Sequence, residues 1–157
     1  MPRGLIVVGI DGSEISRRAL RWAVEEARLR HARVRVVHAW WIYPMLAADM
    51  EAPHLTSDAS GTVQAFVTET LGEEHDVEVE VVAVQGRQAS AALVDAAEDA
   101  ELLVVGSRGA GGFSSLLLGS VSQQCAHHAP CPVAIVGRGP EEDHRRHDAR
   151  AEAGEGT

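Results

Sequence analysis

The stretch ELLVVGSRGAGGFSSLLLGSVSQQCA, from Glu101 to Ala126, joins an apolar run, a glycine-rich connection and a segment of helical character. The run Leu102–Val105 ends at a glycine and predicts a buried strand. The glycines allow a tight turn and a close approach of backbone to ligand. The helix that follows begins with unpaired N–H groups and partial positive charge. This order predicts an anion site, most often one for phosphate.

Two common phosphate motifs do not fit this stretch. A Walker A loop needs a lysine, but all 14 Lys and Arg residues of the chain are arginine. A dinucleotide fingerprint needs G-x-G-x-x-G in the first βα unit. Here the glycines come late in the chain, with the spacing Gly106-x2-Gly109-x9-Gly119-Ser120.

Strand and helix patterns alternate along the rest of the chain. Apolar runs predict strands at 5–10, 33–40, 77–84, 102–105 and 133–136, and helical spacing predicts helices at 14–30, 59–74, 89–97 and 120–129. The connection 41–57 holds two prolines and is either a functional lid or a featureless loop. The alternation predicts an α/β fold, with a parallel sheet covered by helices on both faces.

Composition sets the limits of the domain and its environment. We expect one domain at 1–137, followed by a disordered tail at 138–157 that has little to bury. The net charge of −9 argues against nucleic acid and anionic membranes as partners. No run is apolar enough to span a membrane and no signal peptide is visible, so we expect a cytoplasmic protein.

The cysteines and histidines of the chain do not have the spacing of zinc ligands, so we expect no metal site. His127 and His128 are adjacent, which is typical of a helix end rather than of a metal site. Cys125 and Cys131 are close in sequence, and we expect reduced thiols rather than a disulfide in the cytoplasm.

The spacing G-x2-G-x9-G-[ST], with the surrounding VVGSRG, GSVS and CPVAIV, resembles the nucleotide-binding signature of the universal stress protein family. The resemblance covers residues 4 to 137. It implies a Rossmann-like open five-stranded parallel sheet with strand order 3-2-1-4-5. In such sheets, ligands bind at the carboxyl ends of the strands where the strand order reverses. The loops there would be 9–13 and 106–120.

The resemblance also implies which residues bind the phosphates. Gly109, Gly119 and Ser120 would line them, and Ser122 can add a second hydroxyl donor. Arg108 either pairs with a phosphate or is simply solvated.

The remaining assignments concern the ribose and the base. Gly106 and Ser107 would lie near the ribose and the first phosphate. Asp11 resembles the family's acid near the nucleotide, or else is a helix-capping acid; Gly9 allows close backbone approach, or else relieves packing. The resemblance places adenine against backbone groups near Ala39.

The function that the resemblance implies is a stress-response binding or sensor module for ATP, or for ADP or AMP, whose phosphates could also hold Mg²⁺. The alternative is an enzyme on a related fold that hydrolyses adenine nucleotides or adenylates a substrate. The segment Gly9–Ser13 is only vaguely similar to an ATP pyrophosphatase loop because it lacks the leading Ser-Gly-Gly. A receiver-like signalling domain would need a lysine near the last strand. With no general base indicated, we expect slow hydrolysis at most.

The last strand, 133–136, is short and apolar, and the implied order puts it at an edge of the sheet. An apolar edge is an aggregation hazard unless it is covered or paired. We therefore expect a homodimer through Pro132 to Gly137, which the resemblance implies as well.

Overall fold

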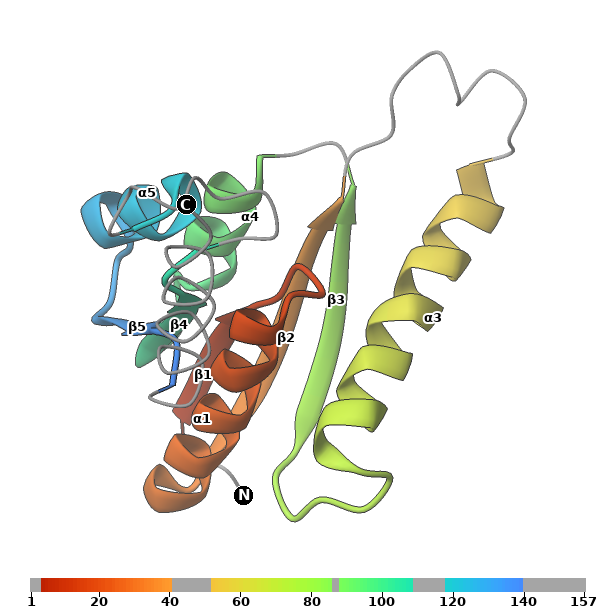
Figure 1. Cartoon of the computed structure of the whole chain (residues 1–157), viewed down its shortest axis with the longest axis horizontal. Coiled ribbons are helices and arrows are strands. Elements are labelled where there is room, and N and C mark those ends of the chain that lie inside the picture. The colour runs from red at the N-terminus through yellow and green to blue at the C-terminus, as the bar shows by residue number, and fades with distance from the viewer. Residues whose placement is uncertain (1–3, 41–51, 86–87, 109–117, 140–157) are drawn as a thin grey trace, which may run out of the picture.

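The computed structural model describes residues 4–40, 52–85, 88–108 and 118–139. The strands are β1 (Gly4–Gly9), β2 (Ala32–Trp40), β3 (Val79–Gln85), β4 (Leu102–Gly106) and β5 (Val133–Val136). The helices are α1 (Glu14–Arg30), α3 (Ala52–Leu71), α4 (Ala89–Ala96) and α5 (Ser120–His128). All neighbouring strands are parallel, and the order is β3-β2-β1-β4-β5, as predicted (Figure 1).

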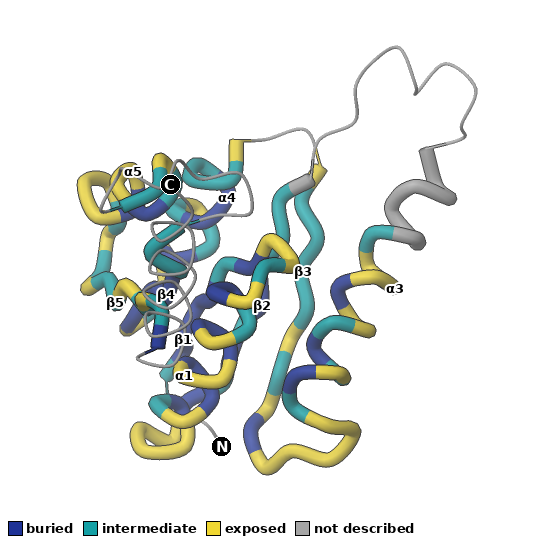
Figure 2. The backbone as a smooth tube through the Cα atoms, in the orientation of Figure 1, coloured by how far each residue is buried: buried dark blue, intermediate teal, exposed yellow. Residues whose placement is uncertain are grey.

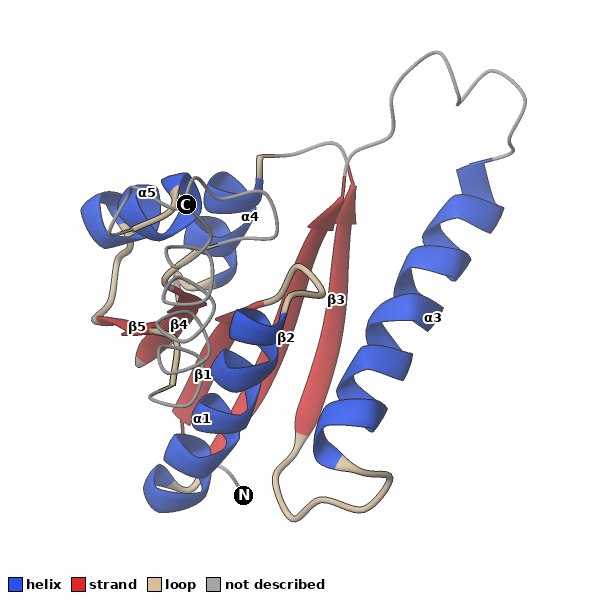
Figure 3. Cartoon of the chain, viewed as in Figure 1, coloured by secondary structure: helices blue, strands red, loops and turns tan. Residues whose placement is uncertain are grey.

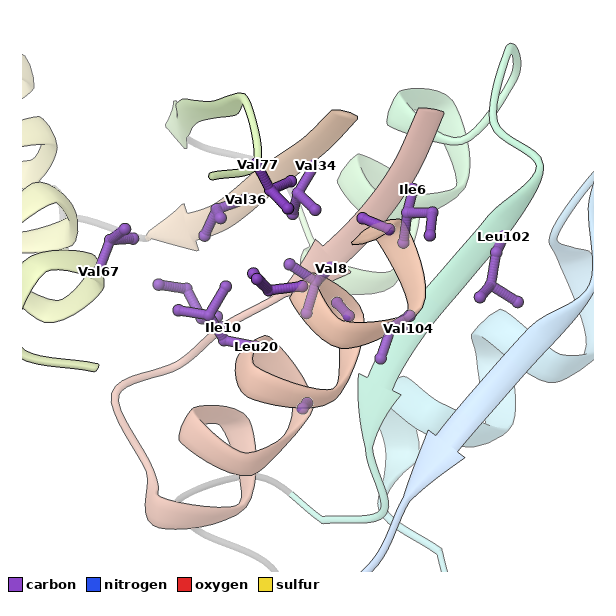
Figure 4. Close-up of a cluster of buried hydrophobic side chains, with 14 of the residues drawn as sticks. Ile6, Val8, Ile10, Leu20, Val34, Val36, Val67, Val77, Leu102 and Val104 are labelled. Carbon is purple, nitrogen blue, oxygen red and sulfur yellow. The ribbon is translucent and has the colours of Figure 1, made fainter. Parts of the chain in front are cut away.

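Helices cover both faces of the sheet (Figure 3). α1 and α3 pack on one face, where Ile6 and Val8 of β1 join a buried cluster with Leu20 (Figure 4). α4 and α5 pack on the other face, where Leu5 and Val7 join a second buried cluster. Successive side chains of a strand point to opposite faces, so β1 needs apolar residues at every position. The continuous run at the start of the chain is explained by this two-sided burial (Figure 2).

The helix α3 differs from its prediction at both ends. It begins at Ala52, seven residues before the predicted start, so 52–57 are helical rather than part of a long connection. Pro53 is compatible with this because the first turn of a helix has unpaired N–H groups in any case. The helix ends at Leu71, before the predicted 74, because Gly72 adopts a left-handed φ of 85° and donates its N–H to Thr68 O.

The remaining predictions at this level have mixed outcomes. The rest of the predicted connection, the tail from 140 onward and Gly109 lie outside the described residues. Both cysteines are free thiols, and His127 and His128 lie in the last turn of α5. Among the described helices, none is long and apolar enough to cross a membrane.

Candidate functional site

The site lies where the strand order reverses, at the carboxyl ends of the adjacent strands β1 and β4. The chain leaves β1 toward α1 on one face of the sheet, and leaves β4 toward α5 on the other. A cavity of about 500 Å³ opens there. Its lining includes eight of the ten predicted site residues: Gly9, Asp11, Ala39, Gly106, Arg108, Gly119, Ser120 and Ser122. Ser107 is not among the described residues that line it, and Gly109 is not described.

The turn between β1 and α1 forms one side of the cavity. Gly12 adopts a left-handed φ of 84°, which lets the chain reverse into the helix. Ser13 is the N-cap of α1, and its hydroxyl accepts a hydrogen bond from Ser16 N. Asp11 Oδ1 accepts a hydrogen bond from Ser13 N at 2.9 Å. Asp11 thus supports the helix start and also lines the cavity, so its two proposed roles are compatible.

Hydrogen bonds hold both ends of the glycine-rich connection in place. Ser107 donates its N–H to Val136 O, and its carbonyl accepts the N–H of Gly119 at 2.7 Å. The hydroxyl of Ser122 donates to Gly119 O at 2.9 Å and lies 3.1 Å from Ser107 O. Ser107 therefore contributes main-chain anchoring, which brings the start of α5 beside the end of β4.

The position of Ser122 changes its expected role. The residue is 1% exposed, and its single hydroxyl hydrogen is directed to main-chain carbonyls. A serine hydroxyl has one hydrogen to donate, so it is not available to a phosphate in this arrangement. Ser120, two residues earlier and exposed, lines the same cavity.

The N-terminus of α5 supplies backbone donors to the cavity. Gly119 is its N-cap, and the first intrahelical hydrogen bond runs from Gln123 N to Gly119 O. The N–H groups of 120–122 precede that bond, and all three residues line the cavity. A cluster of such donors, with the positive end of the helix dipole, suits an anion.

A large part of the cavity wall is apolar. Its members come from two strands, from two helices, from the turn after β1 and from the residues just before α5: Val37, Val105, Leu93, Val121, Ile10 and Leu118. A Cβ on Gly9 would lie 2.8 Å from Leu93 Cδ1, so a larger residue here would require the Leu93 side chain to move. Sequence reasoning missed the contribution of α4, because Ala89 and Leu93 have the same helical spacing as ordinary core residues.

Gly106 has a comparable constraint on the other side of the sheet. A Cβ there would lie 2.6 Å from Ile15 Cγ2 on α1. The glycine therefore lets the first turn of α1 approach the end of β4 closely. Two helix starts, those of α1 and α5, are thereby held beside one cavity.

Charged and nucleophilic groups are few near the site. Asp11 and Arg108 supply one charge of each sign to the lining. Cys125 of α5 is fully buried, and burial raises the pKa of its thiol to about 11, so it is protonated at neutral pH. Within the described ranges, no group of three metal-binding side chains is present.

The fold and the cavity define a Rossmann-like α/β domain with an anion-suited crevice at the switch point. The model of the universal stress protein family matches residues 3–137. The chain belongs to the universal stress protein family.

Relatives in mycobacteria carry the same family name. A universal stress protein of Mycolicibacterium smegmatis is 33% identical over 153 residues, covering 92% of this chain and 51% of the relative. Universal stress protein Rv2623 of Mycobacterium tuberculosis is 37% identical over 146 residues, covering 83% of this chain and 46% of the relative. The chain therefore spans about half the length of these relatives.

Two similar solved structures contain nucleotides. A universal stress protein in complex with cAMP is 28% identical, with a TM-score of 0.64, covering 87% of this chain and 98% of that one. The universal stress protein from Archaeoglobus fulgidus in complex with dAMP is 26% identical, with a TM-score of 0.60, covering 87% and 99%.

Proposed function

We propose that this chain binds an adenine nucleotide, with ATP as the principal ligand, and acts as a binding or sensor module in a stress response. The observation that carries the proposal is the cavity at the switch point. One end of it presents the N-terminus of α5, and its wall is apolar. Such a site suits a ligand with an anionic end and a flat apolar end. The nucleotides in the two related complexes have this chemistry.

The phosphates would be bound at the start of α5. The N–H groups of 120–122 and the Ser120 hydroxyl supply neutral donors there, and Arg108 supplies a positive charge. The base would lie against the apolar wall near Val37, with Ala39 offering main-chain groups.

A Mg²⁺ ion would be held mainly by the phosphates. Asp11 is the carboxylate that lines the described part of the cavity, and no cluster of acidic ligands surrounds it. Magnesium commonly binds in this way, through one or two carboxylates plus substrate phosphates. Its contribution would be to neutralise phosphate charge.

Calorimetry with adenosine, AMP, ADP and ATP, with and without Mg²⁺, tests the proposal. Affinity should rise from adenosine to ATP, because only the phosphorylated ligands reach the α5 N-terminus. Mass spectrometry of any small molecule that co-purifies gives the physiological ligand. The absence of measurable binding for all four ligands would reject the proposal.

The same site predicts slow chemistry. No histidine lines the described part of the cavity, so a general base beside a phosphate is not indicated there. We expect ATP turnover well below about one per second, the low end of the usual enzyme range. A faster rate in the purified protein would favour the enzyme alternative.

A cytoplasmic location and a homodimer also belong to the proposal.

A further inference from the structure

The chain leaves the sheet at Ile10, directly after β1. The register of β1 with β2 ends at Gly9, which pairs with Val37. One more ladder bond follows, from Ile10 N to Val37 O at 3.0 Å. The chain then turns through Asp11 and Gly12 into α1.

The carbonyl of Ile10 is paired with a side chain instead of the ladder. His38 Nδ1 lies 2.9 Å from Ile10 O. A carbonyl oxygen can only accept, so Nδ1 carries the hydrogen and donates. Among the described residues, His38 is the recorded partner of this carbonyl.

His38 makes this bond from the face of the sheet that α1 and α3 cover. Side chains alternate along β2, and Val34 and Val36 belong to the buried cluster beneath α1 and α3. Val37 and Ala39, which flank His38, line the cavity instead. His38 is half-buried and is not among the described lining residues, and its bond to the Ile10 carbonyl links it to the main chain of the cavity.

The two hydrogen bonds at Ile10 fix both of its peptide planes. The plane before Ile10 is held by the Val37 carbonyl, and the plane after it by the His38 ring. The second plane includes the N–H of Asp11, so its orientation sets where Asp11 and the start of α1 lie. Asp11 lines the cavity, and its carboxylate accepts the Ser13 N–H.

We propose that His38 is a positioning residue for the nucleotide site, acting through the Ile10 carbonyl on the Asp11 turn. This inference rests on the proposed nucleotide binding. The ring donor replaces the ladder bond that is lost where β1 leaves the sheet. Without it, the turn would sample other orientations and the binding-competent one would be less populated, which lowers apparent affinity.

Three substitutions at this position separate donor geometry from bulk. His38→Asn places an amide nitrogen one bond beyond Cγ, as Nδ1 is, and should retain affinity within about twofold. His38→Gln places its nitrogen one bond farther out, and His38→Leu has no donor. Both should weaken ATP binding about fivefold or more, which corresponds to the net contribution of one hydrogen bond.

His75→Leu is the matched control. His75 Nδ1 donates to Val77 O at 2.7 Å, a similar histidine–carbonyl bond in the connection between α3 and β3. This variant should bind ATP as the wild type does. Equal affinity for wild type, His38→Leu and His38→Gln would overturn the inference, as would an Asn variant as weak as the Leu variant.

A measurement without nucleotide tests the positioning step by itself. Hydrogen exchange at the amides of 11–13, in the full chain, should be faster in His38→Leu than in wild type and His38→Asn. Nitrogen NMR of the wild-type ring should show Nδ1 protonated. Unchanged exchange or an unprotonated Nδ1 would overturn the inference. If exchange differs among the three proteins as expected but the wild type binds no nucleotide, the proposed function is rejected and the positioning role of His38 remains.

Discussion

Ser120 and Ser122 are two residues apart on the first turn of α5 and have opposite surroundings. Ser120 is exposed and lines the cavity. Ser122 is buried, with its hydroxyl bonded to the carbonyls at both ends of the glycine-rich connection. In the sequence motif both serines offer a hydroxyl donor. Only the packed structure shows that the Ser122 hydroxyl already donates its hydrogen to main-chain carbonyls.

This difference predicts opposite effects of removing each hydroxyl. Ser120→Ala should weaken ATP binding by about 1.5–3 kcal/mol, roughly tenfold or more, if the hydroxyl bonds a charged phosphate. Its urea midpoint should be unchanged. Ser122→Ala should instead lower the free energy of unfolding by about 0.5–1.5 kcal/mol, because it removes a buried hydrogen bond from the hydroxyl to main-chain carbonyls. Calorimetry and urea unfolding of both variants check this, and equal effects on affinity would contradict it.

A second residue-scale prediction concerns Gly106. Gly106→Ala introduces a Cβ 2.6 Å from Ile15 Cγ2, and the Ile15 side chain or α1 must shift to relieve the contact. We expect a loss of about 1–3 kcal/mol in the free energy of unfolding. Gly61→Ala serves as the control, since a Cβ there meets nothing within 4 Å and alanine favours the helix. A fully stable Gly106→Ala variant would show that the contact is easily relieved.

At the scale of elements, α1 is fixed by ionic contacts as well as by its apolar face. Arg17 lies over the Phe66 ring, 4.5 Å from its centroid, and donates to Thr70 Oγ1, which joins α1 to α3. Arg28 makes a bidentate pair with Asp76, both bonds at 2.7 Å. The two contacts connect α1 to α3 and to the connection before β3.

The Arg28–Asp76 pair predicts a dependence of stability on pH. The hydrogen bonds from Arg28 hold the pKa of Asp76 below its usual 3.8. A carboxyl with a lowered folded pKa contributes its full stabilisation above the unfolded value and loses it as the pH falls through the folded value. Asp76→Asn should therefore be less stable than wild type at neutral pH, and the gap should close below about 3.8.

Both groups are at the surface, so the difference should be small and should shrink in high salt. Thermal unfolding at neutral and acid pH measures it. Glu78→Gln is the control, an exposed carboxylate two residues away for which no ion pair is recorded in the described part of the chain. A gap that stays constant with pH would contradict the linkage.

At the scale of the molecule, β5 is an edge of the sheet and its outer backbone groups face no other strand of the described chain. Ile135 is 36% exposed, whereas Ala134 packs against the buried cluster beneath α1. The test substitution should therefore be Ile135→Glu. Glutamate in place of Ala134 would disturb the buried cluster. The sequence alone did not show which of the two positions faces outward.

We expect a homodimer through 132–137, with β5 of two copies paired. Ile135→Glu should shift the mass from dimer toward monomer in light scattering at micromolar concentration, because it places a charge in the paired edge. Leu29→Glu is the matched control, since Leu29 is 78% exposed on α1. Circular dichroism should show both variants folded. A wild-type monomer across this range would rule out the dimer.

The sequence by itself determined the alternation of strands and helices, the two-sided burial of β1 and the glycine spacing before α5. These are local: burial on both faces requires continuous apolar residues, and a helix start after glycines has the same unpaired donors in any chain. The order of strands came from family resemblance, and the structure confirmed it.

Tertiary structure alone decided the contacts between segments far apart in sequence. His38 reaches a carbonyl 28 residues earlier, Arg28 reaches a carboxylate 48 residues later, and the Leu93 side chain packs against Gly9. No local period encodes such pairs, because they exist only once the strands and helices have packed together. The same assembly directed the Ser122 hydroxyl inward and left Ser120 facing the cavity.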